Sequence, residues 1–169
     1  HALGWAHRDL KLENVIMYTP PTDGFVDKII DFGFAARQTD PGRNCTGVMG
    51  TAAYVAPEVI SDQTYDGWAV DMYACGVMLY VMLCGEYPFP SRGLEGVGPD
   101  MRESSKEAIR HSAVSLEGKG LSAAAKHLIS SLMHNEPTTR PTAVQALDDF
   151  TFLRRRVEED SWEELRGLR

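Results

Sequence analysis

The sequence predicts a mainly α-helical domain that packs around one buried central helix and carries a small β-hairpin. Three observations lead to this fold class. An apolar run over about 69–84 has the length of a helix, residues 122–133 repeat apolar side chains with helical spacing, and residues 19–24 form a strong turn signal between two β-branched runs. The 169 residues are enough for one domain with a hydrophobic core.

The N-terminal third of the chain predicts the hairpin and a long loop. Residues 15–18 and 25–30 are short apolar runs rich in β-branched side chains, and the segment Thr-Pro-Pro-Thr-Asp-Gly at 19–24 between them is typical of a turn. Residues 34–55 are rich in Gly, Thr, Asn and Asp and show little periodicity, which indicates a long functional loop. A short helical turn is expected at 58–60.

The rest of the chain predicts the helices. The run at about 69–84 is apolar nearly all round, which is typical of a buried axis. The pattern at 122–133 begins with a serine that can cap it, and a capping box precedes a helix at 143–147. We also expect a short helix at 104–110 and a weak amphipathic helix near 161–168.

Composition and charge limit the classes of function. The net charge of −7 disfavours nucleic acid or an anionic membrane as the main partner. The apolar run is interrupted by Asp71 and is shorter than the roughly 20 residues of a membrane span, so we expect no membrane partner. An odd number of cysteines (Cys45, Cys75 and Cys84) and no N-terminal signal pattern indicate a reducing compartment. We therefore expect a cytoplasmic protein, with the nucleus as the alternative.

The segment His-Arg-Asp-Leu-Lys-Leu-Glu-Asn at 7–14 is the strongest functional signal. Asp9, Lys11 and Asn14 place a carboxylate, an ammonium and a carboxamide two and three residues apart. The segment has neither helical nor strand periodicity. This pattern indicates a loop that holds polar groups together for chemistry.

Two further motifs follow in order, Asp-Phe-Gly at 31–33 and Gly-Thr-Ala-Ala-Tyr-Val-Ala-Pro-Glu at 50–58. With the first loop, they resemble the C-terminal lobe of the catalytic domain of eukaryotic serine/threonine protein kinases. The resemblance covers 1–153, with 91–120 matching poorly, and leaves 154–169 as a tail. The strings Asp-Phe-Gly-Phe-Ala-Ala and Leu-Cys-Gly-Glu-Tyr-Pro-Phe resemble the calcium/calmodulin-dependent kinase group.

The resemblance implies ATP-dependent phosphorylation of Ser or Thr hydroxyls on protein substrates, with Mg²⁺ as the metal. It makes Asp9 the residue that orients the substrate hydroxyl and accepts its proton, and Lys11 the residue that offsets charge on the transferring group. Asn14 and Asp31 would ligate Mg²⁺ through hard oxygens. Thr51 would bond to the catalytic aspartate and lysine, and with that lysine it favours a Ser/Thr over a Tyr kinase.

Other matched residues are expected to hold the lobe together. Glu58 and Arg140 would form a buried ion pair that fixes the end of the activation segment. Asp71, in the central helix, would accept hydrogen bonds from the backbone of the catalytic loop. His7 and Phe32 would belong to a hydrophobic spine, with ordinary core packing as the alternative. Gly33, in the Asp-Phe-Gly motif, is also expected to be structural.

Arg8 implies regulation, because an arginine beside the catalytic aspartate typically binds a phosphate on the activation segment. Counting back from Ala56, the usual phosphosite falls on Gly47, so Thr46 is the best remaining candidate. Without that modification, Arg8 would meet a carboxylate, or regulation would run differently.

Substrate preference is weakly encoded. Glu13 matches a position that often contacts a basic substrate residue upstream of the acceptor. Val81, however, stands where strongly basophilic kinases often carry a second acid. The expected preference is therefore mildly basic.

The upper half of a kinase cannot be recognised in the sequence. Nothing matches the Gly-rich loop, the phosphate-binding lysine or the helix glutamate of an N-terminal lobe. We therefore expect a C-terminal lobe that is inactive alone and needs the missing N-lobe. Two alternatives stay open: a pseudokinase or scaffold lobe that only binds proteins, and an unrelated helical binding domain. The intact Asp9, Lys11, Asn14 and Asp31 count against the scaffold.

Overall fold

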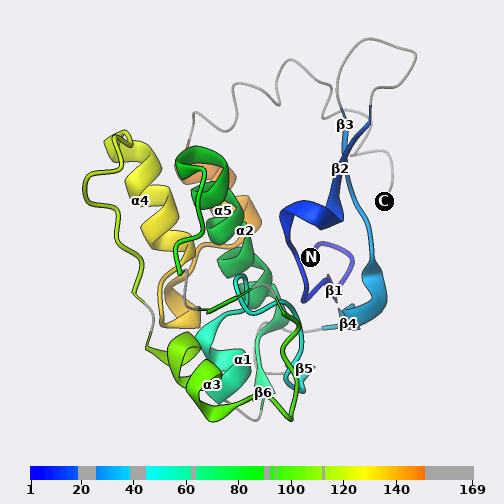
Figure 1. Cartoon of the computed structure of the whole chain (residues 1–169). Helices are drawn as coiled ribbons and strands as arrows, with labels where there is room; N and C mark the ends of the chain where they lie inside the picture. Colours follow the sequence, from blue (N-terminus) through cyan, green and yellow to red (C-terminus); the bar gives the residue numbers. More distant parts are fainter. Residues whose placement is uncertain are drawn as a thin grey trace.

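The computed structural model describes residues 1–18, 26–38, 45–61, 64–89, 92–93, 95–111 and 113–150. This part of the chain is mainly helical. Figure 1 shows α4 (Ala123–Leu132) and α5 (Ala143–Asp149) beside α2 (Gly67–Cys84), with α1 (Pro57–Ser61) and α3 (Glu103–Arg110) near one end of α2. A β-hairpin lies on the opposite side of α2 from α4 (Figure 1). The predicted fold class, mainly helical with a small hairpin, is confirmed in the described residues.

Helix α2 is the axis of the fold. It starts two residues before the predicted position because the Asp66 carboxylate caps it, accepting a hydrogen bond from Trp68 N at 2.9 Å. It ends at Gly85, whose left-handed φ of 71° lets its N–H reach the Val81 carbonyl. By length and composition alone α2 could cross a membrane, but half of it is buried inside the fold, as is typical of a core helix.

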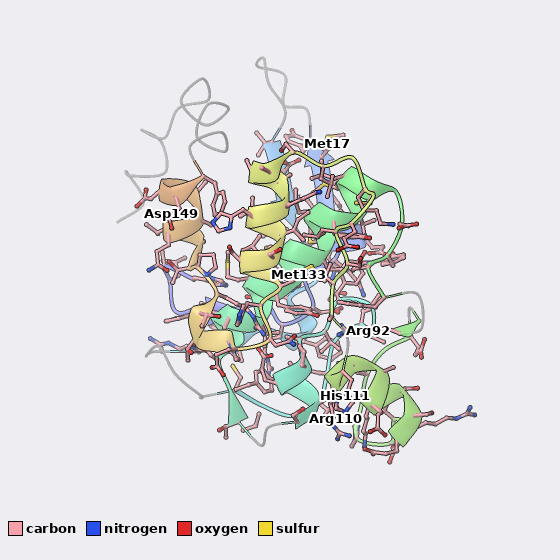
Figure 2. All side chains as sticks on the ribbon, turned by 90° about the vertical axis from the view of Figure 1, so that its left-hand side faces the viewer. Met17, Arg92, Arg110, His111, Met133 and Asp149 are labelled. Atoms are coloured by element: carbon pink, nitrogen blue, oxygen red, sulfur yellow. The ribbon has the colours of Figure 1, made fainter. Side chains whose placement is uncertain are left out.

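The contact between α2 and α4 depends on a glycine. A Cβ built on Gly76 would lie 2.6 Å from Cγ of Met133 and 2.9 Å from Cβ of Leu132, so only a residue without a side chain allows the helices to approach this closely. Met133 lies where the two helices meet (Figure 2). Ser122 caps α4 as predicted, accepting a hydrogen bond from Ala125 N.

The remaining helical predictions are confirmed with small shifts. Helix α3 covers Glu103–Arg110, one residue longer than expected, and α5 continues two residues beyond the predicted end. The capping box of Thr142 and Gln145 is present at the start of α5. The predicted tail and its amphipathic helix lie outside the described residues.

All strand pairs in the described part of the chain are antiparallel. The predicted hairpin is confirmed as β2 (Val15–Tyr18) and β3 (Val26–Ile29), in a register that pairs Val15 with Ile29. The turn predicted at 19–24 lies outside the described residues. Two further pairs, which the sequence did not predict, are β1 (Trp5–Ala6) with β4 (Ala36–Arg37) and β5 (Cys45–Thr46) with β6 (Thr64–Tyr65).

The hydrophobic core lies between α2, α1, α3 and α4, and it includes much of the segment 51–56. The loops also contain short 3-10 helices, among them η1 (Leu12–Asn14), η2 (Phe32–Phe34) and η4 (Pro137–Thr139). Strand β1 and η4 both contact α2. The loop that begins at His7 and the segment around Thr51 are therefore both anchored on the same core.

Candidate active site

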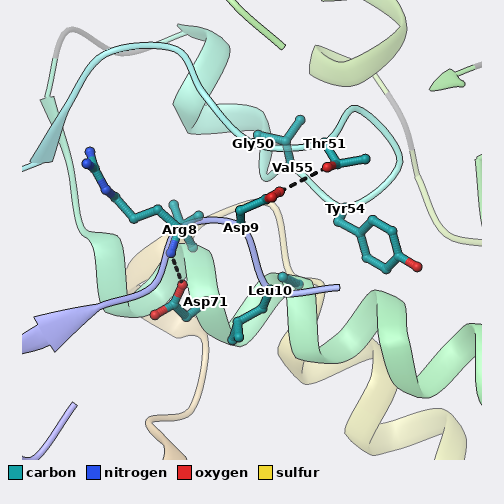
Figure 3. A pocket seen from close by; sticks show the side chains of 10 residues that line it. Arg8, Asp9, Leu10, Gly50, Thr51, Tyr54, Val55 and Asp71 are labelled. Atoms are coloured by element: carbon teal, nitrogen blue, oxygen red, sulfur yellow. Dashed lines mark hydrogen bonds between the residues drawn. The ribbon is translucent and has the colours of Figure 1, made fainter. Parts of the chain in front are cut away.

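The loop after β1 is fixed in place by one buried carboxylate. Asp71, on α2, is 2% exposed and accepts hydrogen bonds from the backbone N–H groups of His7 and Arg8, each at 2.8 Å. Figure 3 shows the bond from Arg8. His1 Nε2 lies 2.9 Å from the same carboxylate. Burial raises the pKa of Asp71, and the two backbone N–H groups act against this shift.

One of the two residues that donate to Asp71, Arg8, has an unfavourable backbone conformation. Arg8 has a φ of 69°, in the left-handed region that non-glycine residues rarely adopt. Strain of this kind persists only where neighbouring groups fix it, and it is common at functional sites. The turn at Arg8 directs the next side chain, Asp9, toward Thr51 (Figure 3).

Asp9, Thr51 and Lys11 form a continuous chain of polar contacts. Thr51 Oγ1 donates a hydrogen bond of 2.9 Å to Asp9 Oδ1, and Lys11 Nζ donates one of 3.1 Å to Thr51 Oγ1. Lys11 Nζ also lies 3.0 Å from Asp9 Oδ2. Both carboxylate oxygens of Asp9 are thus oriented, and the side chain itself is only 7% exposed. The arrangement can hold a hydroxyl and accept its proton beside a cation.

A small, narrow pocket lies beside the contact between Asp9 and Thr51 (Figure 3). It is lined by Arg8, Asp9, Leu10, Gly50, Thr51, Tyr54, Val55, Val70, Asp71 and Ala74. Gly50 allows the two segments to meet, because its φ is 111° and a Cβ there would lie 3.2 Å from the carbonyl oxygen of Arg8. Sequence reasoning did not single out Gly50, although it begins the motif that contains Thr51.

One backbone hydrogen bond connects the segments that carry the two predicted metal ligands, Asn14 and Asp31. Asn14 is buried, its Nδ2 donates to the Asp9 carbonyl at 2.9 Å, and its own carbonyl accepts from Ile30 N at 2.9 Å. Asp31 follows Ile30, is exposed, has a φ of 60°, and accepts a hydrogen bond from Gly33 N at 3.3 Å. Because the Asn14 amide nitrogen donates to the Asp9 carbonyl, the side-chain oxygen is the Asn14 atom that could ligate a metal ion.

The chemistry of this donor set fits Mg²⁺. In the described residues, no group of three or more His, Cys, Asp or Glu is placed to hold a metal ion. An amide oxygen from Asn14 and a carboxylate from Asp31 are hard ligands, and Mg²⁺ in proteins is commonly bound by one or two such groups together with water and substrate phosphates. A pair of oxygen ligands is therefore a suitable donor set for that ion.

His7 connects this loop to the segment of Asp31. Its Nδ1 accepts from Asp9 N at 3.3 Å, so Nε2 carries the proton and donates to the Ile30 carbonyl at 2.9 Å. The His7 ring contacts the Phe32 ring edge to face, with centroids 5.0 Å apart. His7 is buried, whereas Phe32 remains 60% exposed. Phe32 therefore touches His7 but does not pack into the core of the described residues.

The Arg8 guanidinium is bound by neutral oxygens. Its Nε donates to the Phe34 carbonyl at 2.7 Å, and its Nη1 donates to the Thr46 carbonyl at 3.1 Å and to the Tyr65 hydroxyl at 3.4 Å. Tyr65 in turn donates to the Gly47 carbonyl at 2.9 Å. The structure thus brings Arg8 beside the backbone of Thr46 and adds Tyr65, which sequence reasoning missed. Thr46 itself is exposed.

Glu58 and Arg140 form a buried bidentate ion pair. The two contacts between the Arg140 guanidinium and the Glu58 carboxylate measure 2.5 and 2.9 Å, and both side chains are almost fully buried. Arg140 also donates to the carbonyls of Ala69 at 3.0 Å and His134 at 2.7 Å. The pair therefore joins α1, the start of α2 and the segment before α5.

Glu13 lies at the edge of the site beside two tyrosines. The Tyr54 hydroxyl lies 3.5 Å from Glu13 Oε2 and 3.3 Å from the Tyr87 hydroxyl, and the two tyrosine rings meet edge to face. Burial raises the pKa of Tyr54, so its hydroxyl stays protonated. Tyr54 points away from Asp9 (Figure 3). The sequence motif contained Tyr54 but gave no signal for Tyr87.

Comparison with known proteins finds similarity to protein kinases. A family model described as "Protein kinase domain" matches residues 1–152. The chain is 37% identical to serine/threonine-protein kinase SRK2D of Arabidopsis thaliana over 154 residues, 91% of this chain and 41% of that protein. It is also 37% identical to CBL-interacting protein kinase 31 of Oryza sativa subsp. japonica over 151 residues, 88% of this chain and 31% of that protein.

A mammalian kinase shows a similar degree of likeness. The chain is 34% identical to MAP kinase-activated protein kinase 2 of Mus musculus over 148 residues, which cover 88% of this chain and 37% of that protein. The chain thus spans between 31% and 41% of the length of these three relatives.

Proposed function

This chain belongs to the protein kinase domain family of serine/threonine kinases, and on that premise we propose that the Asp9 site transfers the γ-phosphoryl group of ATP to Ser or Thr hydroxyls of protein substrates. The observation that carries the proposal is the chain of contacts from Lys11 through Thr51 to Asp9. It places an oriented carboxylate and a cation side by side, and phosphoryl transfer needs mainly such positioning and charge stabilisation.

Each member of that chain has a distinct role in the proposal. Asp9 binds the acceptor hydroxyl and accepts its proton. Thr51 donates a 2.9 Å hydrogen bond to Asp9 Oδ1 and so fixes the orientation of the carboxylate. Lys11 offsets negative charge on the transferring group, from a position where its side chain is 22% exposed and can reach a bound molecule.

ATP with Mg²⁺ is the phosphoryl donor in this proposal. Asn14 and Asp31 would hold the metal, which neutralises charge on the nucleotide phosphates when bound. His7 supports both ligands indirectly, because its ring bonds to the Ile30 carbonyl beside Asp31 and receives the Asp9 N–H. Gly33 contributes the N–H that orients the Asp31 carboxylate.

We place these residues in the C-terminal lobe of the kinase domain. The 169 residues contain no match to a Gly-rich loop or a phosphate-binding lysine, and the relatives are more than twice as long as the matched region. In this proposal an N-terminal lobe, supplied outside these residues, completes the ATP site, and the 169 residues alone have negligible activity.

The finer assignments follow the sequence motifs. We propose a substrate with a mildly basic preference, because the exposed Glu13 carboxylate lies beside the site with only the long contact to Tyr54 among the described residues. We place the enzyme in the calcium/calmodulin-dependent group and in the cytoplasm. We propose that Thr46 is phosphorylated and that Arg8 binds the phosphate, since its guanidinium already reaches the Thr46 carbonyl.

A kinase assay on the full-length protein tests the proposed function. Incorporation of phosphate into a basic Ser/Thr peptide, dependent on Mg²⁺ and ATP, is the expected result. Stable binding of protein partners without any phosphate transfer would favour the scaffold alternative. Robust activity of the 169 residues alone would contradict the proposal that a further lobe is required.

A further inference from the structure

One arginine is fully buried in the part of the sequence that matches the kinase pattern poorly. Arg92 is 1% exposed and is among the largest buried side chains of the described residues. Figure 2 shows it near α3, and its contacts reach three other segments. A guanidinium is rarely buried without a structural reason, because removing its charge from water is unfavourable.

The contacts of Arg92 join three segments that are distant in sequence. Nη1 donates to the Val55 carbonyl at 3.0 Å, and Nη2 donates to the Ile109 carbonyl at 2.9 Å and contacts the Tyr73 hydroxyl at 3.3 Å. The guanidinium stacks on the Phe89 ring at 3.9 Å. Val55 lies just after Thr51, Ile109 is on α3 and Tyr73 is on α2, so Arg92 ties the Thr51 segment to two helices.

The residues that follow Arg92 hold the other side of the Thr51 segment. The Ala52 N–H donates to the Glu95 carbonyl at 2.9 Å, and the Val97 N–H donates to the Gly50 carbonyl at 2.8 Å. These two bonds flank Thr51, which faces Gly96 in an antiparallel bridge. Backbone bonds on both sides of Thr51 therefore come from one neighbouring segment.

A short path leads from Arg92 to Asp9. Arg92 binds the Val55 carbonyl, the Val55 N–H donates to the Thr51 carbonyl at 3.0 Å, and the Thr51 hydroxyl donates to Asp9. The turn from Thr51 to Val55 is thus fixed at one end by Arg92 and at the other by the contact with the catalytic loop. A shift of this turn would move the Thr51 hydroxyl away from Asp9.

We propose that Arg92 is a positioning residue of the phosphoryl-transfer site, which acts by fixing the turn that presents Thr51 to Asp9. The catalytic part of this inference rests on the proposed function. The positioning itself does not, because it concerns only the order of the segment 50–57. A neutral residue of similar length would fill the same space but would leave the carbonyls of Val55 and Ile109 without this donor.

The test compares Arg92→Met and Arg92→Lys with the control Arg110→Met in the full-length protein. Arg110 lies in the last turn of α3, at the surface, where it pairs with Glu103. Two readouts are needed: kcat and KM for ATP and peptide, and amide hydrogen exchange of the segments 50–57 and 123–149. The second segment contains α4 and α5 and reports on the fold as a whole.

The proposal predicts a local effect. Arg92→Met is expected to accelerate exchange of 50–57 about tenfold or more, with 123–149 unchanged. It should lower kcat about tenfold or more at an unchanged KM for ATP, since small misplacements near a site cost rates of this order. Arg92→Lys, which keeps the charge but can satisfy fewer carbonyls, should fall between wild type and Arg92→Met. Arg110→Met should match wild type.

Three results would overturn the proposal: wild-type exchange at 50–57 in Arg92→Met, unchanged kcat, or an equal rise in exchange over both segments, which would make Arg92 a general core residue. If Arg92→Met does not fold, Arg92→Lys decides by the same exchange criteria. A local exchange effect in a protein whose wild type transfers no phosphate would refute the proposed function and leave the positioning of Thr51 intact.

Discussion

The Thr51 hydroxyl donates a 2.9 Å hydrogen bond to the Asp9 carboxylate, joining two loops that are 42 positions apart in the sequence. The first loop is held by Asp71 on α2, and the second lies on the main hydrophobic core. Each loop is held by its own contacts on the common core, so this bond forms only when both loops are correctly placed. The geometry of the proposed catalytic base therefore depends on α2 and on the core that holds the Thr51 segment.

Removing the Thr51 hydroxyl should impair turnover while ATP binding is kept. Thr51→Val has a similar shape but cannot donate to Asp9, so we expect kcat to fall about 10- to 100-fold in the full-length protein, at an unchanged KM for ATP. Thr51→Ser keeps the hydroxyl and is expected to retain most of the activity. Steady-state kinetics with a Ser/Thr peptide measure both, and equal rates for the valine and serine variants would contradict the assigned role.

The buried ion pair should dominate the stability of the α1 region. Glu58→Gln leaves the Arg140 charge buried without its partner, and we expect the free energy of unfolding to fall by about 3–5 kcal/mol. Urea unfolding followed by circular dichroism measures this. The control is Glu86→Gln, which breaks a surface pair with Lys119 and should leave the unfolding midpoint near that of wild type. A midpoint for Glu58→Gln equal to that of Glu86→Gln would show that the pair is not a structural anchor.

Cys75 should be unreactive at mildly alkaline pH. Burial raises the pKa of its thiol to about 12, which favours the protonated form, so the reactive thiolate appears only well above pH 9. At pH 8.5 we expect iodoacetamide to label Cys75 slowly in the native protein and rapidly after denaturation, as read by mass spectrometry. Similar labelling rates in the two states would contradict the raised pKa of this thiol.

Phosphorylation of Thr46 should act through Arg8. A phosphate on this exposed residue would lie beside a guanidinium that already contacts its carbonyl, and it would add a charge-assisted contact. We expect mass spectrometry to find the phosphate on active protein, and Thr46→Ala to lower kcat. In an Arg8→Ala background the same substitution should have no further effect. If the active protein lacks this phosphate and Thr46→Ala leaves kcat unchanged, the prediction is wrong. The carbonyl contacts of Arg8 would then be enough to hold the active arrangement.

The parts of the fold that the sequence predicted are those with local signals. Helix α2 follows from its apolar run, α4 from its periodicity and its Ser122 cap, and the hairpin from two β-branched runs. The pairs β1–β4 and β5–β6 have two residues per strand, which is too short for an alternating pattern to be recognised. Their pairing is decided by the packing of loops that are far apart in sequence.

The residues of the site also divide into those that a local sequence pattern indicates and those that it does not. Asp9, Lys11 and Asn14 lie in one motif, so their proximity follows from their spacing. Arg92 lies in a segment rich in glycine and proline, where an arginine is normally exposed, and its burial depends on carbonyls 37 and 17 positions away. Tyr87 contacts Tyr54 only because α2 ends at Gly85 and the chain that follows lies beside Tyr54. Such contacts exist only in the folded chain, so no local pattern could indicate them.

The proposed role of Asp9, as the base of a phosphoryl-transfer site, can be tested with Asp9→Asn in the full-length protein. Asparagine keeps the shape and can still accept the Thr51 hydrogen bond but cannot take up the substrate proton, so we expect kcat to fall about 100-fold or more with KM for ATP little changed. Asp27→Asn, on the exposed face of β3, is the matched control and should keep wild-type activity. An Asp9→Asn protein that phosphorylates its peptide at the wild-type rate would show that Asp9 is not the base.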